Sequence, residues 1–434
     1  MRKRWLVFAL LVGVLAFVAA GCGGGDDDGG SAEGNEDVTG EISVMAIWAG
    51  EEQESFQAVA DGFMELYPNV TVNYNSGGDN LAPLLATAVE GGNPPDIAAI
   101  GQPGLMADFA GQNAIQPLDD LRDAIVDNLG ESAADVGAVD GTQYGILFKA
   151  SNKSTIWYNV ASFEEAGVEP PEDWEGLSEV AETIKAAGIK PYSVGVDVGW
   201  PMTDLFENIY IRSAGADMYD QLARHEIPWT DQSVKDALAI MAEVVGDSDN
   251  LAGGTEGALQ TEMPDSVAKV FTDSPEAAMV IIGDFAPGVT ETTLEPETGY
   301  NVFTFPSIEG SGPSVIGSGD LFVQFKDSPA ADAFLEYLTT PEASEIWAER
   351  GGFSSPNQNI DLDVYPDEIT RATAGALSEA ESFRFDMSDL QPSAFGGTPG
   401  AGLFKHFTDF VANPDDIDGI TEKMEADAAK AFGQ

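Results

Sequence analysis

Apolar and polar positions alternate along the chain with two periods, which predicts strands and helices in turn. Residues 41–48 form an apolar, strand-like run, and residues 51–66 carry apolar side chains at helical spacing until Pro68. A strand over residues 70–74 and a helix over residues 80–90 follow. Further strands are expected at residues 96–100, 154–158, 192–196, 278–282, 300–305 and 321–325, and helices at residues 174–187, 202–213, 231–245, 330–338 and 341–350. This alternation predicts an α/β fold with a largely parallel sheet.

Two other features bear on the organisation of the chain. Residues 139–148 have the pattern of a β-hairpin that turns at Asp140 and Gly141, and the chain after Asn357 is mostly helical in pattern. No repeat with a period of roughly 20–50 residues occurs, which argues against a solenoid or propeller. The length of 434 residues predicts two domains or lobes.

The N-terminus has the pattern of a secretory signal. Residues 2–4 are basic, residues 5–20 are apolar but short for a membrane span, and small residues precede Cys22. A cysteine in this position resembles a bacterial lipobox. We therefore expect residues 1–21 to be a signal peptide and Cys22 to be lipidated; a plain cleaved signal and a retained anchor are the alternatives. Residues 22–37 would then carry the lipid and form a flexible tether rich in Gly and acidic residues.

Charge and composition exclude several classes of function. With 19 Lys and Arg against 74 Asp and Glu, the net charge is −55, which disfavours nucleic-acid binding and basic docking on anionic lipid. The 43% hydrophobic content supplies sizeable cores and excludes global disorder. The acidic surface suits a salty medium, which we keep as a hypothesis. A single cysteine excludes intrachain disulfides and cysteine metal sites.

Signatures of catalysis are missing. The two histidines, His225 and His406, have no nucleophile motif beside them and are interpreted as surface or packing residues. No HExxH, phosphate-binding loop or dinucleotide fingerprint occurs. The acidic run at residues 415–419 lacks the ligand spacing of a calcium loop. We therefore expect a protein that is not an enzyme and that needs neither cofactor nor metal.

Aromatic and polar residues instead gather at the ends of predicted strands. Trp48 closes the first strand, Gln102 follows the third, Asp284 and Phe285 follow the buried strand at 278–282, and Trp200 opens a helix. Ligands of open α/β sheets bind outside the carboxyl ends of strands. Aromatic faces can stack on a sugar ring while amides and carboxylates take its hydroxyls, and a neutral sugar meets no charge penalty here. The alternative is that each aromatic side chain fills a core.

Several motifs resemble one family in order and spacing. They are the strand 42–48 with its amphipathic helix, residues 92–97, residues 144–159, residues 163–167, residues 171–174, and residues 279–285, where Asp284 and Phe285 stand in place of the family's Pro and Trp. The chain from about residue 41 to residue 432 resembles the family 1 extracellular solute-binding proteins, the receptors of ABC-type sugar importers. Residues 102–105, 199–204, 225–231 and 153–158, with Lys149, are similar to its α-glucoside-binding subgroup.

The resemblance implies a two-lobed, periplasmic-binding-protein-like α/β fold of type II, with a ligand cleft between the lobes and hinge-crossing segments. Lobe one would comprise residues 38–150 and 305–355, and lobe two residues 151–304 and 356–434. A Lys beside carboxylates can equally be a structural ion pair, an alternative that stays open for Lys149. The implied ligand-binding residues are Trp48, Glu51, Gln102, Lys149, Trp200, Asp204, Asp284, Phe285, Asp320 and Phe395.

The implied function is a monomeric receptor that is lipid-anchored outside the cell membrane, or periplasmic. It would bind a carbohydrate, an α-glucoside or other oligosaccharide, and deliver it to ABC permease subunits served by a cytoplasmic ATPase. Two alternatives remain open at this point. One is a receptor of the same fold for a non-sugar ligand such as a polyamine, which the negative charge would favour, and the other is a secreted glycoside-active enzyme.

Overall fold

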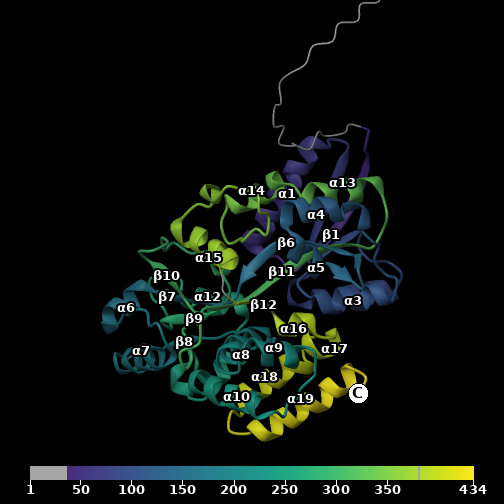
Figure 1. Ribbon diagram of the computed structural model, residues 1–434. Helices are drawn as coiled ribbons and strands as arrows, with labels where there is room; N and C mark the ends of the chain where they lie inside the picture. The colour runs from purple at the N-terminus through teal and green to yellow at the C-terminus, as the bar shows by residue number, and fades with distance from the viewer. Residues whose placement is uncertain (1–36, 380–381) are drawn as a thin grey trace, which may run out of the picture. The chain divides into compact units, whose positions relative to one another are not determined.

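The computed structural model of the protein describes residues 37–379 and 382–434 (Figure 1). The expected signal peptide, Cys22 and residues 23–36 of the expected tether lie outside the described residues. Within the described part, two larger sheets and their helices build two lobes, and each lobe has its own apolar core. No helix in this part of the chain is long and apolar enough to cross a bilayer.

The first sheet is mixed. Its six strands are β1 (Gly40–Ala46), β2 (Val70–Ser76), β3 (Ile97–Ile100), β6 (Gly145–Asn152), β11 (Ser314–Gln324) and β12 (Ser382–Phe385). β1 pairs in parallel with β2 and β3, whereas β11 runs antiparallel to both β3 and β6. The parallel pairing expected from the strands near the start of the chain is confirmed for β1, β2 and β3, and the antiparallel pairings of β11 make the sheet as a whole mixed. β11 enters directly from the second lobe, so no local strand–helix–strand unit sets its direction.

The second sheet is also mixed. Its order is β10 (Tyr300–Thr304), β7 (Thr155–Asn159), β9 (Met279–Ile281) and β8 (Tyr192–Ser193), and only β8 and β9 pair in parallel. A separate small hairpin joins β4 (Ala138–Val139) to β5 (Thr142–Gln143). Asp140 and Gly141 have φ values of 51° and 83°, as a tight hairpin turn requires, so the expected turn is present. The chain then enters β6 instead of extending that hairpin.

The first core forms beneath α1 (Gly50–Leu66). Phe56, Val59 and Phe63 of this helix are fully buried against the sheet, as their helical spacing predicts. Trp48 and Trp347 pack edge to face beside Phe56, with ring centroids 4.9 Å apart. The other helices of this lobe are α2 (Leu81–Glu90), α3 (Pro103–Gly111), α4 (Arg122–Leu129), α5 (Glu131–Val136), α13 (Pro329–Leu338) and α14 (Pro341–Ala348).

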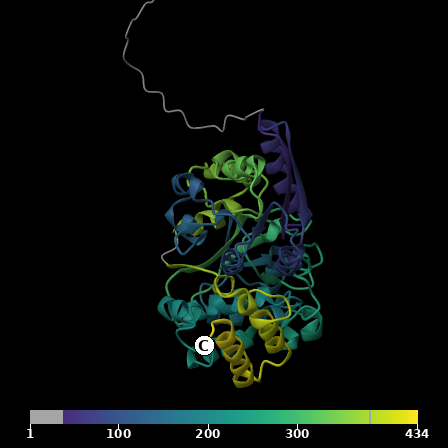
Figure 2. The ribbon, with the colours of Figure 1, turned by 90° about the vertical axis from the view of Figure 1, so that its right-hand side faces the viewer.

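The second core surrounds α8 (Trp200–Ser213). Helices α18 (Gly402–Ala412) and α19 (Ile417–Ala431) come from the end of the chain and lie beside α8 and α10 (Gln232–Val245), as Figures 1 and 2 show. α8 is buried on every side, including its polar residues Asp204, Glu207 and Asn208. The remaining helices are α6 (Val160–Ala166), α7 (Trp174–Ala186), α9 (Ala216–Ala223), α11 (Gly254–Ala258), α12 (Met263–Ala268), α15 (Glu368–Glu379), α16 (Met387–Leu390) and α17 (Ser393–Gly396).

The chain passes between the two sheets at Lys153, which lies between β6 and β7, and again between β10 and β11. The two crossing segments are in contact. The backbone N–H of Lys153 donates to the carbonyl of Ile316 in β11 at 2.8 Å. The backbone N–H of Asp284, just after β9, donates to the carbonyl of Asn152 at 3.0 Å. The ends of several strands therefore meet around Lys153.

Candidate ligand-binding cleft

A cavity of about 460 Å³ opens where these strand ends meet. Trp48 follows β1, Gln102 follows β3, Phe285 follows β9, and Trp200 begins α8, so both lobes contribute to the wall. The position agrees with the general location of ligand sites outside the carboxyl ends of strands, and the volume is typical of small-molecule sites. The charged lining residues are Glu52, Asp79, Lys149, Lys153, Glu262, Asp320 and Asp389.

Six of the ten residues proposed from the sequence line this cavity: Trp48, Gln102, Lys149, Trp200, Phe285 and Asp320. The side-chain amide of Gln102 donates to the carbonyl of Gly397 at 2.9 Å, which links the end of β3 to the loop before α18. The cleft residues of the two lobes are thus already in contact.

The other four lie elsewhere. Asp204 and Asp284 are buried behind the residues that line the cavity, where they contact Lys153 and Ser354 respectively. Glu51 points into a neighbouring cavity. Phe395 is fully buried in the second core, with its ring centroid 5.5 Å from that of Trp229. The ligand-binding role of all ten residues stays a prediction.

Trp200 is the aromatic side chain best placed to meet a ligand. It is half-buried, while Trp48 is only 1% exposed and donates its indole N–H to Asp320 Oδ2 at 3.0 Å. The Trp200 ring lies 6.2 Å from that of Phe285, and Lys153 Nζ lies 5.4 Å from the Trp200 centroid. Trp200 and Phe285 therefore form a paired aromatic wall, with Lys153 held against the indole by a cation–π contact.

Lys149 is the basic centre of one side of the cavity. Its ammonium forms an ion pair with Glu52 of α1, and Asp320 and Asp284 lie nearby. Burial opposes the charged form, but these three carboxylates outweigh it and raise the pKa of Lys149. Burial raises the pKa of Asp284 to about 6, because its hydrogen bond with Ser354 and the Lys149 charge only partly compensate for desolvation.

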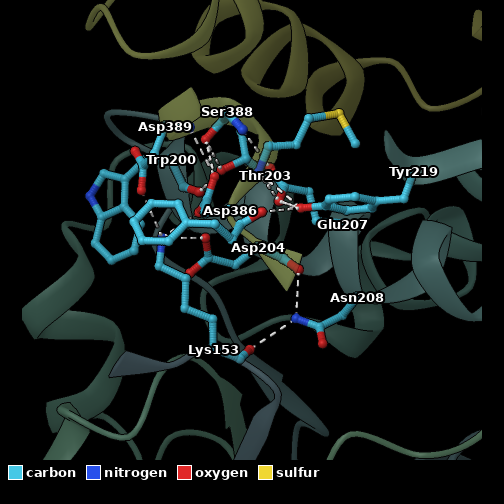
Figure 3. Close-up of polar contacts among 12 residues, drawn as sticks. Lys153, Trp200, Thr203, Asp204, Glu207, Asn208, Tyr219, Asp386, Ser388 and Asp389 are labelled. Atoms are coloured by element: carbon cyan, nitrogen blue, oxygen red, sulfur yellow. Dashed lines mark hydrogen bonds and ion pairs between the residues drawn. The ribbon is translucent and has the colours of Figure 1, made fainter. Parts of the chain in front are cut away.

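Lys153 is the centre of a second, more deeply buried cluster (Figure 3). Its ammonium lies 2.9 Å from Asp204 Oδ1, 2.5 Å from Asp386 Oδ2 and 3.8 Å from Asp389 Oδ2. Burial opposes the charge on Lys153, but the three aspartates raise its pKa well above the usual value. Burial also opposes the ionisation of Asp386, but Lys153 holds the pKa of Asp386 below its usual range. One cation thus faces three carboxyl groups.

The other two carboxyls of the cluster are harder to ionise than free aspartates. Burial raises the pKa of Asp204 to about 7, against the opposing effect of Lys153. Burial and the Asp386 charge raise the pKa of Asp389 well above its usual range. Of the three aspartates in the cluster, Asp389 lines the cavity, and its raised pKa makes its carboxyl harder to ionise there.

Glu207 fixes the turn that carries Asp389. It accepts hydrogen bonds from the Tyr219 hydroxyl at 2.5 Å and from the backbone N–H groups of Met387 and Ser388 at 2.7 Å and 3.0 Å (Figure 3). Burial and the charge of a nearby aspartate raise the pKa of Glu207 well above its usual range. The start of α16 is therefore anchored to α8 directly behind the cavity.

The cavity is of a size suited to a small-molecule ligand, and neither histidine of the chain lines it. The two histidines lie away from it, where their ring nitrogens contact Glu425 at 3.1 Å and Asp427 at 2.8 Å on α19. Within the described residues, no group of three or more His, Cys, Asp or Glu side chains is arranged to hold a metal ion. The carboxylates that surround both lysines disfavour an anionic ligand.

The sequence of the chain matches a family model over residues 49–345, and that model describes the bacterial extracellular solute-binding proteins. The chain belongs to this family. The family consists of extracellular solute-binding proteins, and a relative from Pyrococcus horikoshii that is 27% identical over 399 residues is named as an ABC transporter extracellular-binding protein. The expected family and the two-lobed solute-binding fold are confirmed.

Two relatives cover most of the solute-binding chain. The osmoprotective compounds-binding protein GgtB of Synechocystis sp. is 34% identical over 395 residues, which are 89% of this chain and 92% of GgtB. The alpha-glucosides-binding periplasmic protein AglE of Rhizobium meliloti is 32% identical over 393 residues, which are 87% of this chain and 84% of AglE. Both relatives are thus similar along nearly their whole length.

Solved structures show the same fold at low sequence identity. The bacterial solute receptor AcbH, which prefers β-D-galactopyranose, superposes with a TM-score of 0.80 at 20% identity, covering 91% of this chain and 100% of AcbH. RafE in complex with raffinose superposes with a TM-score of 0.74 at 18% identity, covering 91% of this chain and 100% of RafE. At these identities the likeness establishes the fold alone.

Proposed function

We propose that this solute-binding protein captures a small neutral α-glucoside in the cleft between its lobes and delivers it to an ABC permease. The observation that supports this most strongly is the aromatic wall of Trp200 and Phe285, which lines the same cavity as Gln102, Asp320 and Asp389. An aromatic face suits the C–H face of a sugar ring, and the polar groups suit its hydroxyls.

The relatives support the ligand class. AglE is named for α-glucosides and GgtB for osmoprotective compounds, and this chain is at least 32% identical to both. Loss of an aromatic contact would weaken binding without abolishing the fold, because Trp200 is only half-buried at the start of its helix. Binding by lobe closure about the passages near Lys153 would involve no chemistry on the ligand.

The lobes are proposed to comprise residues 38–150 with 305–355, and residues 151–304 with 356–434. The anchor is a separate part of the proposal. The Cys22 thiol would be acylated, and Cys22 would become the new N-terminus when residues 1–21 are removed. The Gly-rich tether to residue 37 would then hold the monomeric receptor at the membrane. Cys22→Ser should release the protein from the membrane fraction, and an unchanged membrane fraction would contradict the lipid anchor.

A thermal unfolding panel tests the ligand class. The purified protein is melted with maltose, trehalose, sucrose, glucose, glycerol phosphate and spermidine, because a ligand that binds only the folded state raises the midpoint. At 100 times its dissociation constant it adds about 2.7 kcal/mol to the free energy of unfolding. A shift with α-glucosides supports the proposal, and no shift with any sugar contradicts it.

A cationic ligand is the second candidate, favoured by the charge of the cleft. Asp79 and Glu262 also line the cavity, while Lys149 and Lys153 are each already paired with carboxylates. A thermal shift with spermidine alone would select a polyamine-type ligand over a sugar.

A further inference from the structure

A second cavity of about 320 Å³ adjoins the ligand cleft, and Glu52 lines both. Along α1, Gly50 faces the cleft, Glu51 faces the second cavity, and Glu52 lies between them. The same division recurs in the loop after β9, where Val289 lines the cleft while Gly288 and Thr290 line the second cavity. A thin wall built by a few residues therefore separates the two spaces.

The Glu52–Lys149 ion pair is the side-chain part of this wall. Lys149 Nζ lies 5.5 Å from the centroid of Phe285, which lines the cleft, and 5.3 Å from that of Trp347, which lines the second cavity. The side chains of Lys149 and Glu52 are only 4% and 12% exposed, so the pair fills the gap between the two aromatic rings. Each charge neutralises the other where neither meets bulk water.

Two glycines form the backbone part of the wall. A Cβ atom on Gly352 would lie 2.9 Å from the Cα of Gly288, so these loops approach as closely as glycine allows. A Cβ atom on Gly288 would lie 3.7 Å from Glu52 Cγ. Glu52 is thus packed against the loop that carries Gly288, and it is the side chain there whose shortening would open the wall.

The second cavity is suited to hydroxyl-bearing groups. Thr290, Thr292, Thr293 and Thr370 line it together with Arg350. Thr370 is only 4% exposed, and its hydroxyl has no hydrogen-bond partner among the described residues. An additional sugar ring entering this space would meet several side-chain hydroxyls and a guanidinium donor.

We propose that the Glu52–Lys149 pair is a specificity-determining wall, which ends the ligand cleft and limits the length of the α-glucoside that the protein accepts. This inference rests on the proposed function. A longer ligand would need the second cavity, and the intact pair blocks the way into it. Shortening Glu52 should join the two spaces and relax the length limit.

The test compares two double variants by calorimetric titration with maltose, maltotriose and maltotetraose. Glu52→Ala/Lys149→Met removes the wall, and Glu52→Gln/Lys149→Met keeps the volume at residue 52 while removing the same charges. We expect the wild type and the Gln variant to disfavour the longer sugars. In the Ala variant, the ratio of the dissociation constants for maltotetraose and maltose should fall about tenfold relative to the Gln variant.

The outcomes separate this proposal from the proposed function. If the wild type binds maltose and both variants show the same relative affinities for the three sugar lengths, the wall proposal is overturned while the α-glucoside assignment stands. If neither the wild type nor the variants bind any of the three sugars, the wall proposal falls, and the thermal panel with trehalose and sucrose decides whether the α-glucoside proposal falls as well. A crystal structure of the wild type with maltose covers the case in which the Ala variant does not fold. In that structure we expect the terminal sugar ring of maltose to contact Glu52 and Lys149. A ligand whose last ring lies away from both residues would overturn the wall proposal.

Discussion

Replacing Lys153 with methionine should destabilise the protein strongly. The side chain is 8% exposed, and its ammonium lies 2.9 Å from Asp204 and 2.5 Å from Asp386. Methionine keeps the length of the side chain but leaves buried carboxylates without a cation. Breaking a buried pair by removing one partner costs about 3–5 kcal/mol, and we expect a loss of this size at neutral pH.

The loss should depend on pH in a definite direction. The folded pKa of Asp386 lies below its usual value, despite burial, because Lys153 stabilises its charge. That contribution is present above the unfolded pKa of Asp386 and is lost as the pH falls through the folded pKa. Without Lys153 the contribution disappears, and the carboxyls can relieve their repulsion only by binding protons. The cost of Lys153→Met should therefore be largest near pH 8 and shrink toward pH 4.

Unfolding followed by circular dichroism across this pH range measures the cost. Lys235→Met is the matched control, because Lys235 and Asp418 form an ion pair whose side chains are 27% and 82% exposed. An exposed pair is worth about 0–1 kcal/mol, so the control should change stability little at any pH. Equal costs for the two variants, or a Lys153→Met cost that does not change with pH, would show that Lys153 does not stabilise the buried carboxylates.

Three further predictions concern the cluster and the wall. Asp389→Asn should gain stability relative to the wild type as the pH rises from 5 to 8 in thermal melts. The raised pKa of Asp389 gives the wild type stability that is lost as the pH rises, and asparagine does not titrate. Stability curves of the two proteins that run parallel with pH would contradict this. Gly352→Ala should destabilise the protein by more than the roughly 1–2 kcal/mol that a left-handed backbone alone costs, because its Cβ would clash with Gly288. Gly400→Ala, at φ +73° with nothing within 4 Å of its Cβ, is the control and should cost only that amount in the same assay. Equal costs would show that the two loops do not approach so closely. Tyr219→Phe should cost about 1–3 kcal/mol in chemical denaturation, because Glu207 loses a buried hydrogen bond at 2.5 Å, and a neutral effect would show that this bond is unimportant.

Much of the fold follows from local sequence patterns. The apolar spacing in α1 placed Phe56, Val59 and Phe63 on its buried face, and the turn at Asp140 lies where the sequence predicts it. The direction of β11 could not be predicted in this way. β11 is antiparallel to its neighbours β3 and β6 because of the path the chain takes through the second lobe, and no local pattern encodes that path.

Only some of the cleft residues could be predicted from the sequence. Residues that directly follow a strand, such as Trp48 and Gln102, reach the cleft because strand ends converge. Glu51 was proposed and Glu52 was not, although successive helix residues differ in direction by about 100°. Glu52 precedes the buried Phe56 by four positions, so the helical spacing already placed it on the inward face.

The buried cluster shows what the sequence does not reveal. Lys153 and Asp204 are about fifty positions apart, and Asp386 is more than two hundred positions from Lys153, yet all three meet at the passage between the sheets. Such a contact depends on the tertiary path and leaves no local motif. Asp389 was missed because it lies on a short turn whose position depends on the bonds to Glu207.

Calorimetric titration of maltose into the wild type and Trp200→Ala tests the central claim most directly, namely that the cleft binds a neutral α-glucoside against its aromatic wall. We expect saturable binding to the wild type. We also expect a loss of more than about 1 kcal/mol in the variant, which is at least fivefold in the dissociation constant. Trp200→Phe should retain part of the affinity, because a smaller aromatic face remains. An unchanged dissociation constant in Trp200→Ala would contradict the placement of the ligand. The absence of saturable binding of maltose, trehalose and sucrose to the wild type would contradict the ligand class.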